Sequence, residues 1–242
     1  MARFAEAFRL LWKNFGLFTA IVLTVWLPAS ILLNYVTYYS EAQTSTLRPM
    51  RMSMWIDSIC SPLYVGALVF ALFQIKSGRK VTYREAIAVG FRKWGSLFVA
   101  RFIAGILVVL AMLALLVPGM ILAVRYSLLD EVVVLEQASI TTTSREKSTA
   151  LTAGKRWPIF WSAVLFLTCF VALSYLIYLA QELIQGLDTM LVGIILDCIT
   201  NVGYVIFHIV LFLFYWEQTS DERGKANDAQ ELPPDVLQGS PA

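Results

Sequence analysis

Five long apolar segments constrain the fold of this chain more than any other feature. They cover residues 15–39, 53–75, 95–117, 159–180 and 189–216. Each holds about 20 residues or more, which is enough to cross a hydrocarbon core of roughly 30 Å at about 1.5 Å per residue. With 58% hydrophobic residues, 15% charged residues and a mean hydropathy of +0.69, the chain is too apolar for a water-soluble domain. We therefore predict an all-α integral membrane protein.

A sixth apolar segment, residues 119–136, is interrupted by charges and could either span the membrane or lie at its surface. Cytoplasmic loops of membrane proteins are enriched in Lys and Arg, so the two cases can be compared. If the segment spans, fifteen of the 19 basic residues face the cytoplasm and only Arg48 and Arg51 face outside. If it does not span, the bias almost vanishes. We therefore predict six transmembrane helices with both termini in the cytoplasm.

A sequence repeat supports this topology. The run from Thr82 to Glu85, which leads to Arg92-Lys93-Trp94, is echoed by the run from Thr143 to Glu146, and a weaker copy lies near the N-terminus. Each copy leads into an apolar segment. Thr-x-x-Glu is the pattern of a capping box, in which two side chains satisfy free backbone N–H groups, so we expect helices to begin after Thr82 and Thr143.

The repeat divides the chain into three hairpins, each introduced by a cytoplasmic amphipathic helix. The predicted boundaries are 4–75, 82–136 and 143–216, within one membrane domain of residues 1–216. After residue 216 the sequence is polar and shows no apolar period, which predicts a disordered cytoplasmic tail over residues 217–242.

The ends of the amphipathic helices combine positive charge with tryptophan. Such helices bury an apolar face in the membrane interface and present cations to anionic headgroups. Alternatively, these ends are ordinary basic flanks with an aromatic belt, which explains the tryptophans but not the caps. The predicted lipid-contacting residues are Arg92, Lys93, Trp94, Lys155, Arg156 and Trp157.

Charged residues inside the predicted spans should be paired, because an isolated charge at the centre of a span costs about 2.5 to 3.5 kcal/mol. Arg101 and Glu131 lie at similar depths in the second hairpin and are predicted to form an ion pair. Asp57, Arg125 and Asp197 lie in the outer half of their spans and are predicted to cluster. The cluster is either a substrate or proton site, or a set of ion pairs that holds the helices together.

Other functional classes receive no support from the residues. The three cysteines lie in apolar segments without C-x-x-C spacing, and His208 is the only histidine, so we predict neither disulfides nor a metal site. Nucleophile, phosphate-binding and zinc-protease motifs do not occur in the sequence. The net charge of +2 gives no reason to expect nucleic acid as a partner. We predict no enzymatic activity and no cofactor.

Three consecutive motifs resemble a bacterial membrane-protein family. Pro118-Gly119 is followed at the sixth position by Arg125, residues 133–136 read VVLE, and residues 148–157 read STALTAGKRW. The chain resembles the glycerophosphoryl-diester-phosphodiesterase membrane domain and its stand-alone YciC-like relatives, well over residues 80–217 and weakly over the first hairpin. The resemblance implies a six-span module of the bacterial inner membrane. It carries over no catalytic residue, because the phosphodiesterase chemistry of that family resides in a separate soluble barrel.

Two functions remain open on the sequence. The leading prediction is a non-enzymatic protein of envelope or lipid homeostasis in the bacterial cytoplasmic membrane, which binds anionic lipid headgroups and assists another membrane protein or a second copy of itself. The alternative is a transporter or channel with a polar site between the hairpin repeats, formed by Arg125, Asp57 and Asp197. A cavity among the spans would favour the alternative, and a closely packed bundle would count against it.

Overall fold

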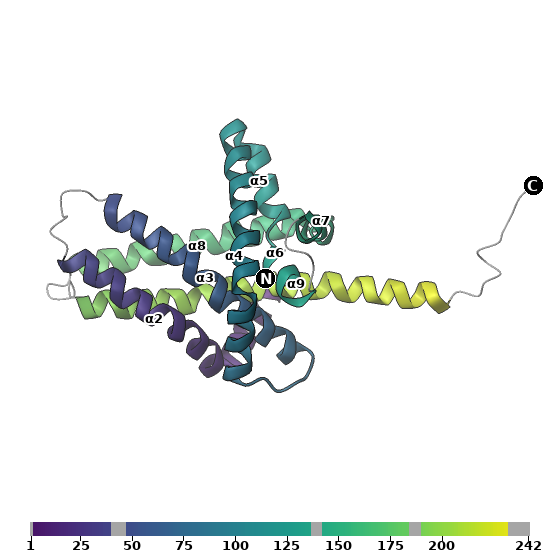
Figure 1. The fold of residues 1–242 in the computed structure, drawn as a ribbon, viewed down its shortest axis with the longest axis horizontal. Helices are drawn as coiled ribbons and strands as arrows, with labels where there is room; N and C mark the ends of the chain where they lie inside the picture. Colours follow the sequence, from purple (N-terminus) through teal and green to yellow (C-terminus); the bar gives the residue numbers. More distant parts are fainter. Residues whose placement is uncertain (1, 40–46, 137–141, 184–189, 232–242) are drawn as a thin grey trace, which may run out of the picture.

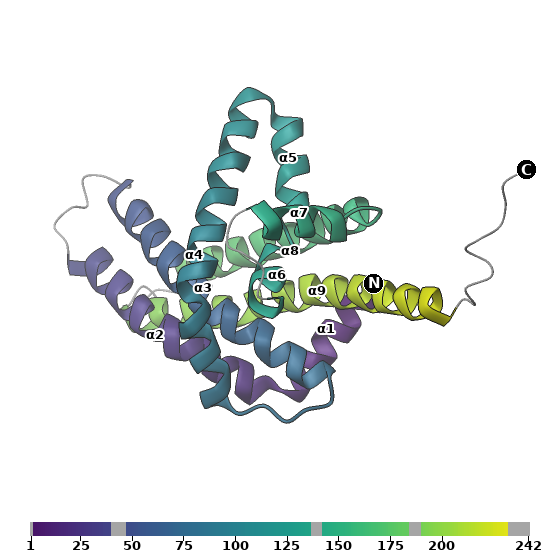
Figure 2. The ribbon, with the colours of Figure 1, turned by 45° about the vertical axis from the view of Figure 1, so that its right-hand side comes forward.

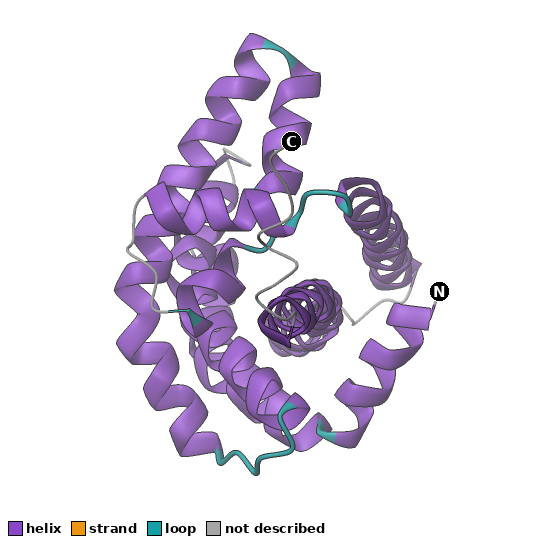
Figure 3. Cartoon of the chain, turned by 90° about the vertical axis from the view of Figure 1, so that its right-hand side faces the viewer, coloured by secondary structure: helices purple, strands orange, loops and turns teal. Residues whose placement is uncertain are grey.

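The computed structural model describes residues 2–39, 47–136, 142–183 and 190–231, and every regular element within these ranges is a helix (Figures 1 and 3). Five helices are long and apolar enough to span a membrane, which confirms the predicted all-α membrane class. These are α2 (Phe15–Tyr39), α3 (Leu47–Lys76), α4 (Tyr83–Ala114), α8 (Arg156–Leu183) and α9 (Met190–Glu231). The shorter helices are α1 (Ala2–Lys13), α5 (Leu116–Arg125), α6 (Leu129–Leu135) and α7 (Thr142–Leu151).

The C-terminal helix α9 is the element around which the first helices pack. α1, α2 and α3 all contact α9, and α3 in turn packs along α4. Figure 3 looks almost along α8 and α9, which run side by side. Apolar side chains from most of the helices meet in one core, and the largest fully buried ones on α2, α3, α4 and α9 include Phe18, Ile21, Leu68, Leu72, Leu97, Ile209, Phe212 and Phe214.

The crossing of α3 and α4 depends on small residues. A Cβ atom added to Gly90 of α4 would lie 2.6 Å from the backbone oxygen of Leu63 and 3.1 Å from Cβ of Ala67. No real side chain tolerates the first distance, so only glycine permits this approach. Close backbone contact through small residues is a common way for helices to associate in membranes, where apolar burial alone gives little preference for protein over lipid.

α4 and α5 form an antiparallel hairpin that stands across α8 and α9 (Figures 1 and 2). The predicted span ends at residue 117, but α4 already ends at Ala114, and Leu115, in an extended conformation, is the only link to α5. Pro118 lies in the first turn of α5, where its missing N–H is tolerated. Gly119 is needed where the two helices touch, because an added Cβ would lie 2.8 Å from Cα of Met112.

The sixth predicted span, residues 119–136, does not form one helix. α5 ends at Arg125, a turn occupies residues 126–128, and α6 begins at Leu129. Ten residues of α5 rise only about 15 Å, which is half of a hydrocarbon core. α5 packs on α4, whereas α6 lies against α3, α4 and α7. The chain therefore returns from the tip of the hairpin through two short helices with a break between them.

The two predicted helix starts have different outcomes. Thr82 caps α4 as expected: its hydroxyl accepts from the backbone N–H of Glu85, whose carboxylate accepts from the backbone N–H of Thr82. The start predicted after Thr143 is wrong, because α7 begins at Thr142 and Thr143 lies inside it. The two segments also differ in how they connect to the apolar helix that follows. The capped segment is continuous with the apolar part of α4, whereas α7 is separated from α8 by a turn with Gly154 at a positive φ of 80°.

The polar segment after residue 216 begins as helix rather than as a disordered tail. α9 continues to Glu231, and residues 232–242 lie outside the described part of the chain. Glu217 explains part of the extension, since its carboxylate accepts from Arg3 of α1 at 2.7 Å. The guanidinium of Arg3 also lies 4.3 Å from the ring centroid of Phe214, which ties α1 to the same stretch of α9. Tertiary contacts thus favour helix where composition favoured disorder.

A candidate ligand cavity between the hairpins

A cavity of about 980 Å³ lies among the long helices. Its lining residues come from α2, α3, α4, α5, α6, α8 and α9, so each of the three predicted hairpins contributes to it. Most of the lining is apolar and aromatic. The apolar and aromatic members include Trp26, Leu33, Met54, Tyr64, Met112, Met120, Phe160, Val164, Leu167, Phe170, Tyr204 and Phe207.

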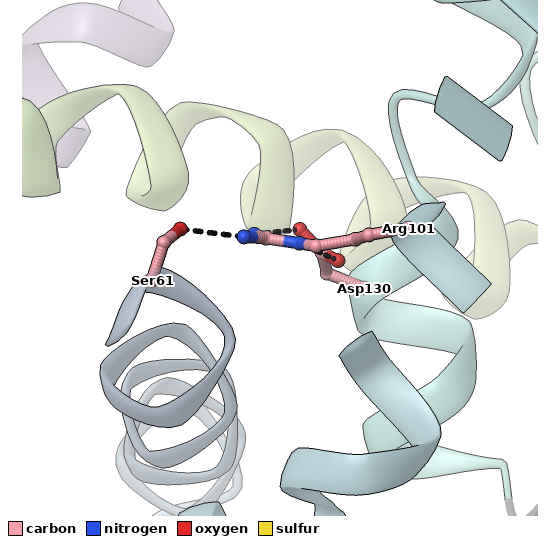
Figure 4. A network of polar contacts seen from close by, with 3 residues as sticks. All are labelled: Ser61, Arg101 and Asp130. Carbon is pink, nitrogen blue, oxygen red and sulfur yellow. Dashed lines mark hydrogen bonds and ion pairs between the residues drawn. The ribbon is translucent and has the colours of Figure 1, made fainter. Parts of the chain in front are cut away.

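An ion pair between Arg101 and Asp130 forms the best-defined polar feature of the cavity (Figure 4). Nε of Arg101 donates to Oδ1 of Asp130 at 2.7 Å, and Nη2 donates to Oδ2 at 2.6 Å. The remaining Nη1 donates to the hydroxyl of Ser61 on α3 at 2.5 Å. Two parallel bonds to one carboxylate are the strongest arrangement that arginine makes. The group therefore connects α3, α4 and α6 at the cavity wall.

Glu131 was predicted as the partner of Arg101, and this pairing is wrong. The side chain of Glu131 is only 1% exposed, and its Oε2 atom has no hydrogen-bond partner among the described residues. The physical reason is the phase of α6. Adjacent residues on an α-helix point about 100° apart. Because Asp130 faces Arg101 and the cavity, its neighbour Glu131 is directed into the packed core.

The predicted cluster of Asp57, Arg125 and Asp197 is not assembled either. Both aspartates line the cavity, but Arg125 does not, and none of the ion pairs within the described part of the chain includes it. Arg125 is the last residue of α5, so the break at residues 126–128 changes the direction of the chain just beyond it. Its Nε atom is buried without a hydrogen-bond partner.

The two cavity aspartates differ in their surroundings. Asp197 of α9 accepts from the hydroxyl of Ser30 at 3.2 Å and from the side-chain amide of Asn34 at 2.8 Å, so two neutral donors of α2 hold it. Asp57 of α3 has no hydrogen bond and no ion pair with any residue that the structure describes. Arg101 is near enough to Asp57 for an electrostatic interaction, but its donors are already engaged by Asp130 and Ser61.

His208 belongs to an aromatic group at the cavity. It is 7% exposed and lines the cavity from α9. Its ring lies 6.2 Å from that of Tyr64 and 5.8 Å from that of Tyr204, measured between centroids. Within the described ranges it has ring contacts but no hydrogen bond. The ring contact with Tyr64 joins His208 of α9 to α3.

The predicted lipid-contacting residues of α4 are only partly on the surface. Arg92 is exposed. Lys93 instead donates from Nζ to the backbone oxygen of Val133 at 3.3 Å, and Trp94 donates from Nε1 to the backbone oxygen of Ile59 at 2.8 Å. Because the capped segment and the span are one continuous helix, this turn of α4 packs against α3 and α6 rather than lying free at an interface.

The corresponding residues around the start of α8 are also only partly on the surface. The Trp157 side chain is 70% exposed, whereas Ile159, two residues further on, is buried. Lys155 lies 4.0 Å from the carboxylate of Glu217, and Nε of Arg156 is buried without a hydrogen-bond partner. Of the six predicted lipid contacts, Arg92, Trp94 and Trp157 are exposed, whereas Lys93, Lys155 and Arg156 are half-buried.

Comparisons with protein-family models, with curated proteins and with solved structures found no match for this chain. The family resemblance of residues 80–217 therefore stays a prediction. The cavity is the feature of the molecule that bears on its function. Two residues that define it, Ser61 and Asp130, were not singled out by the sequence. The alternative partner, Asp130, could have been found by considering both rotations of the LDEVVVL helix, one with Asp130 and one with Glu131 facing Arg101.

Proposed function

We propose that this protein binds a lipid-like, amphipathic molecule in the cavity between its hairpins, and that it does so without converting that molecule chemically. The cavity is the observation that supports this proposal. Its volume of about 980 Å³ is at the upper end of the range for ligand pockets, and mostly apolar walls with a few placed polar groups are typical of such sites. An amphipathic molecule would satisfy both parts of the lining.

Each part of the lining has a role in this proposal. Apolar residues of α8, such as Val164, Leu167 and Phe170, would contact the apolar portion of the ligand. Arg101, Asp130 and Ser61 would face its polar group, and their mutual hydrogen bonds hold them in place before the ligand arrives. Groups that are already ordered lose less conformational freedom on binding, which favours affinity.

The proposed setting is the bacterial cytoplasmic membrane, with both termini in the cytoplasm. The distribution of basic residues supports this topology, and it requires that α5 and α6 together return the chain to the cytoplasmic side. Arg92 and Trp157 would then contact headgroups at the inner interface. The family resemblance of residues 80–217 supports a role in lipid or envelope homeostasis, and a partner membrane protein or a second copy fits that role.

Transport is the second candidate function. One observation favours it: the break between α5 and α6 falls at the cavity, because Tyr126 and Ser127 of the break and Asp130 of α6 line it. Interrupted helices with free helix ends are the usual binding elements of secondary transporters. A transporter would release its ligand on the other side of the membrane, whereas a binding protein would retain it.

The experiment that tests ligand binding compares two tryptophan variants of the full chain by native mass spectrometry. Ala163→Trp on α8 places an indole in the cavity, and Ala172→Trp places it on an exposed position of the same helix. We expect wild type and Ala172→Trp to retain co-purified lipid-like molecules and Ala163→Trp to lose them. Equal retention by both variants would show that the bound molecules occupy another surface, and it would refute the proposal.

A further inference from the structure

The charges that face the cavity do not balance. Three carboxylates line it, those of Asp57, Asp130 and Asp197, against one guanidinium, that of Arg101. Asp130 is the carboxylate that Arg101 neutralises, through two hydrogen bonds. Asp57 and Asp197 consequently remain without a cation of their own. Asp57 is exposed and Asp197 is half-buried, so both carboxylates can be reached by a ligand. An unpaired charge within a membrane-spanning segment is costly, and a cation bound beside these carboxylates would balance it.

Asp57 is the carboxylate best placed to meet a ligand. Asp57, Ser61 and Tyr64 follow one another at helical spacing on α3, and all three line the cavity. Ser61 is bound by Arg101, whereas Asp57 has no partner within the part of the chain that the structure describes. The buried imidazole of His208 lines the same cavity from α9, and it forms no hydrogen bond to the described residues. Two polar side chains are therefore left for a ligand.

The remaining lining identifies the kind of cation. The described residues contain no group of three or more His, Cys, Asp or Glu side chains that could hold a metal ion, and 980 Å³ is far larger than an ion requires. Aromatic rings are abundant instead: Trp26, Tyr64, Tyr204 and Phe207 all line the cavity. The faces of such rings attract organic cations, most strongly when the cation is desolvated. Carboxylates together with aromatic rings thus fit a bulky organic cation.

We propose that the ligand of this cavity is an amphipathic organic cation, such as a lipophilic amine or quaternary ammonium compound. Its charge lies beside Asp57, within reach of the aromatic rings, and its apolar part lies against α8. This inference rests on the proposed function, since it presumes that the cavity takes up amphipathic molecules, and it adds the sign of their charge.

The test uses two probes of the same shape and opposite charge, tetraphenylphosphonium and tetraphenylborate. Binding of each radiolabelled ion to the full chain in uncharged nanodiscs is measured by equilibrium dialysis, with empty nanodiscs as the blank. We expect saturable binding of the phosphonium and none of the borate. Asp57→Asn should weaken phosphonium binding about tenfold, because desolvated charge pairs at interfaces contribute at least that factor. The control Asp221→Asn changes an exposed carboxylate at the far end of α9 and should leave binding unchanged.

The outcomes separate this inference from the proposed function. Equal or stronger binding of the borate, blocked by Ala163→Trp, would show an amphipath-binding cavity without a preference for cations and would overturn only the inference. Saturable binding of neither ion overturns the inference, while the native mass spectra still decide the proposed function. Phosphonium binding that is unaffected by Asp57→Asn also contradicts the inference. Loss of folding cannot mimic the expected result, because removing an unpaired carboxylate should leave the melting temperature unchanged or raise it.

Discussion

Removing the Arg101 side chain should destabilise the protein by leaving Asp130 without its cation. The pair shares two hydrogen bonds, and Arg101 makes a third to Ser61. Breaking a buried ion pair from one side typically costs 3 to 5 kcal/mol. The Arg101 and Asp130 side chains remain 27% and 15% exposed, so the lower end of this range applies. We therefore expect Arg101→Met to lower the free energy of unfolding by about 3 kcal/mol.

The double variant tests whether the loss comes from the ion pair. Arg101→Met combined with Asp130→Leu removes both charges and replaces them with apolar side chains of similar size, a change that is often neutral in buried pairs. We expect the double variant to regain most of the loss, with a coupling energy of about 2 kcal/mol or more. For a chain of this length a loss of 3 kcal/mol corresponds to a fall of about 6 to 12 °C in melting temperature.

The assay is unfolding of the purified full chain in a mild detergent, followed by tryptophan fluorescence during heating and during titration with a denaturing detergent. Arg125→Met is the matched control, because Arg125 makes no ion pair with any described residue. Its effect should be below about 1 kcal/mol, as for most substitutions that disturb no specific contact. If the losses of Arg101→Met and Asp130→Leu are simply additive, or if Arg125→Met is the more damaging change, the reasoning is wrong.

Three further predictions follow from the same structure. Gly119→Ala should lower the melting temperature measurably, because the new methyl group meets the backbone of Met112, and overpacking costs about 1 to 3 kcal/mol; an unchanged melting temperature would mean that α4 and α5 do not pack this closely. Thr82→Ala should cost about 1 kcal/mol through loss of the helix cap, whereas Thr82→Ser should cost much less, and equal losses would argue against the cap. Glu146→Cys, on an exposed position of α7 and in a background without Cys60, Cys169 and Cys198, should react with a membrane-impermeant maleimide only after the cells are opened; labelling of intact cells would contradict the proposed topology.

The predictions that succeeded depend on local sequence. Long apolar segments are helical in a membrane because the backbone N–H and C=O groups must be satisfied within the segment. Five of the six predicted spans correspond, for this reason, to helices that are long and apolar enough to cross a membrane. The capping box at Thr82 likewise involves groups within four residues of one another. The cap predicted at Thr143 failed even though its pattern is the same, because a local pattern permits a cap but does not exclude an earlier helix start.

The candidate site could be predicted only in part. Arg101, Asp57 and Asp197 were selected because charges within apolar segments are costly, and all three line the cavity. Their partners were assigned by depth in the membrane, which leaves the rotation of each helix undetermined. Asp130 and Glu131 have nearly the same depth but point about 100° apart. Depth therefore could not distinguish the partner of Arg101 from a residue of the core.

By itself the sequence determined the helical membrane class of this protein, the positions of its long apolar segments and the presence of charges within them, because these properties depend on transfer of short segments from water to an apolar medium. Only the tertiary structure decided that α5 and α6 are separate helices, that α9 extends to Glu231, and that Arg101 pairs with Asp130. It also decided that Asp57 and Asp197 face a cavity. These features depend on the relative rotation and crossing of helices, which contacts between helices, such as Gly119 with Met112 and Arg3 with Glu217, determine.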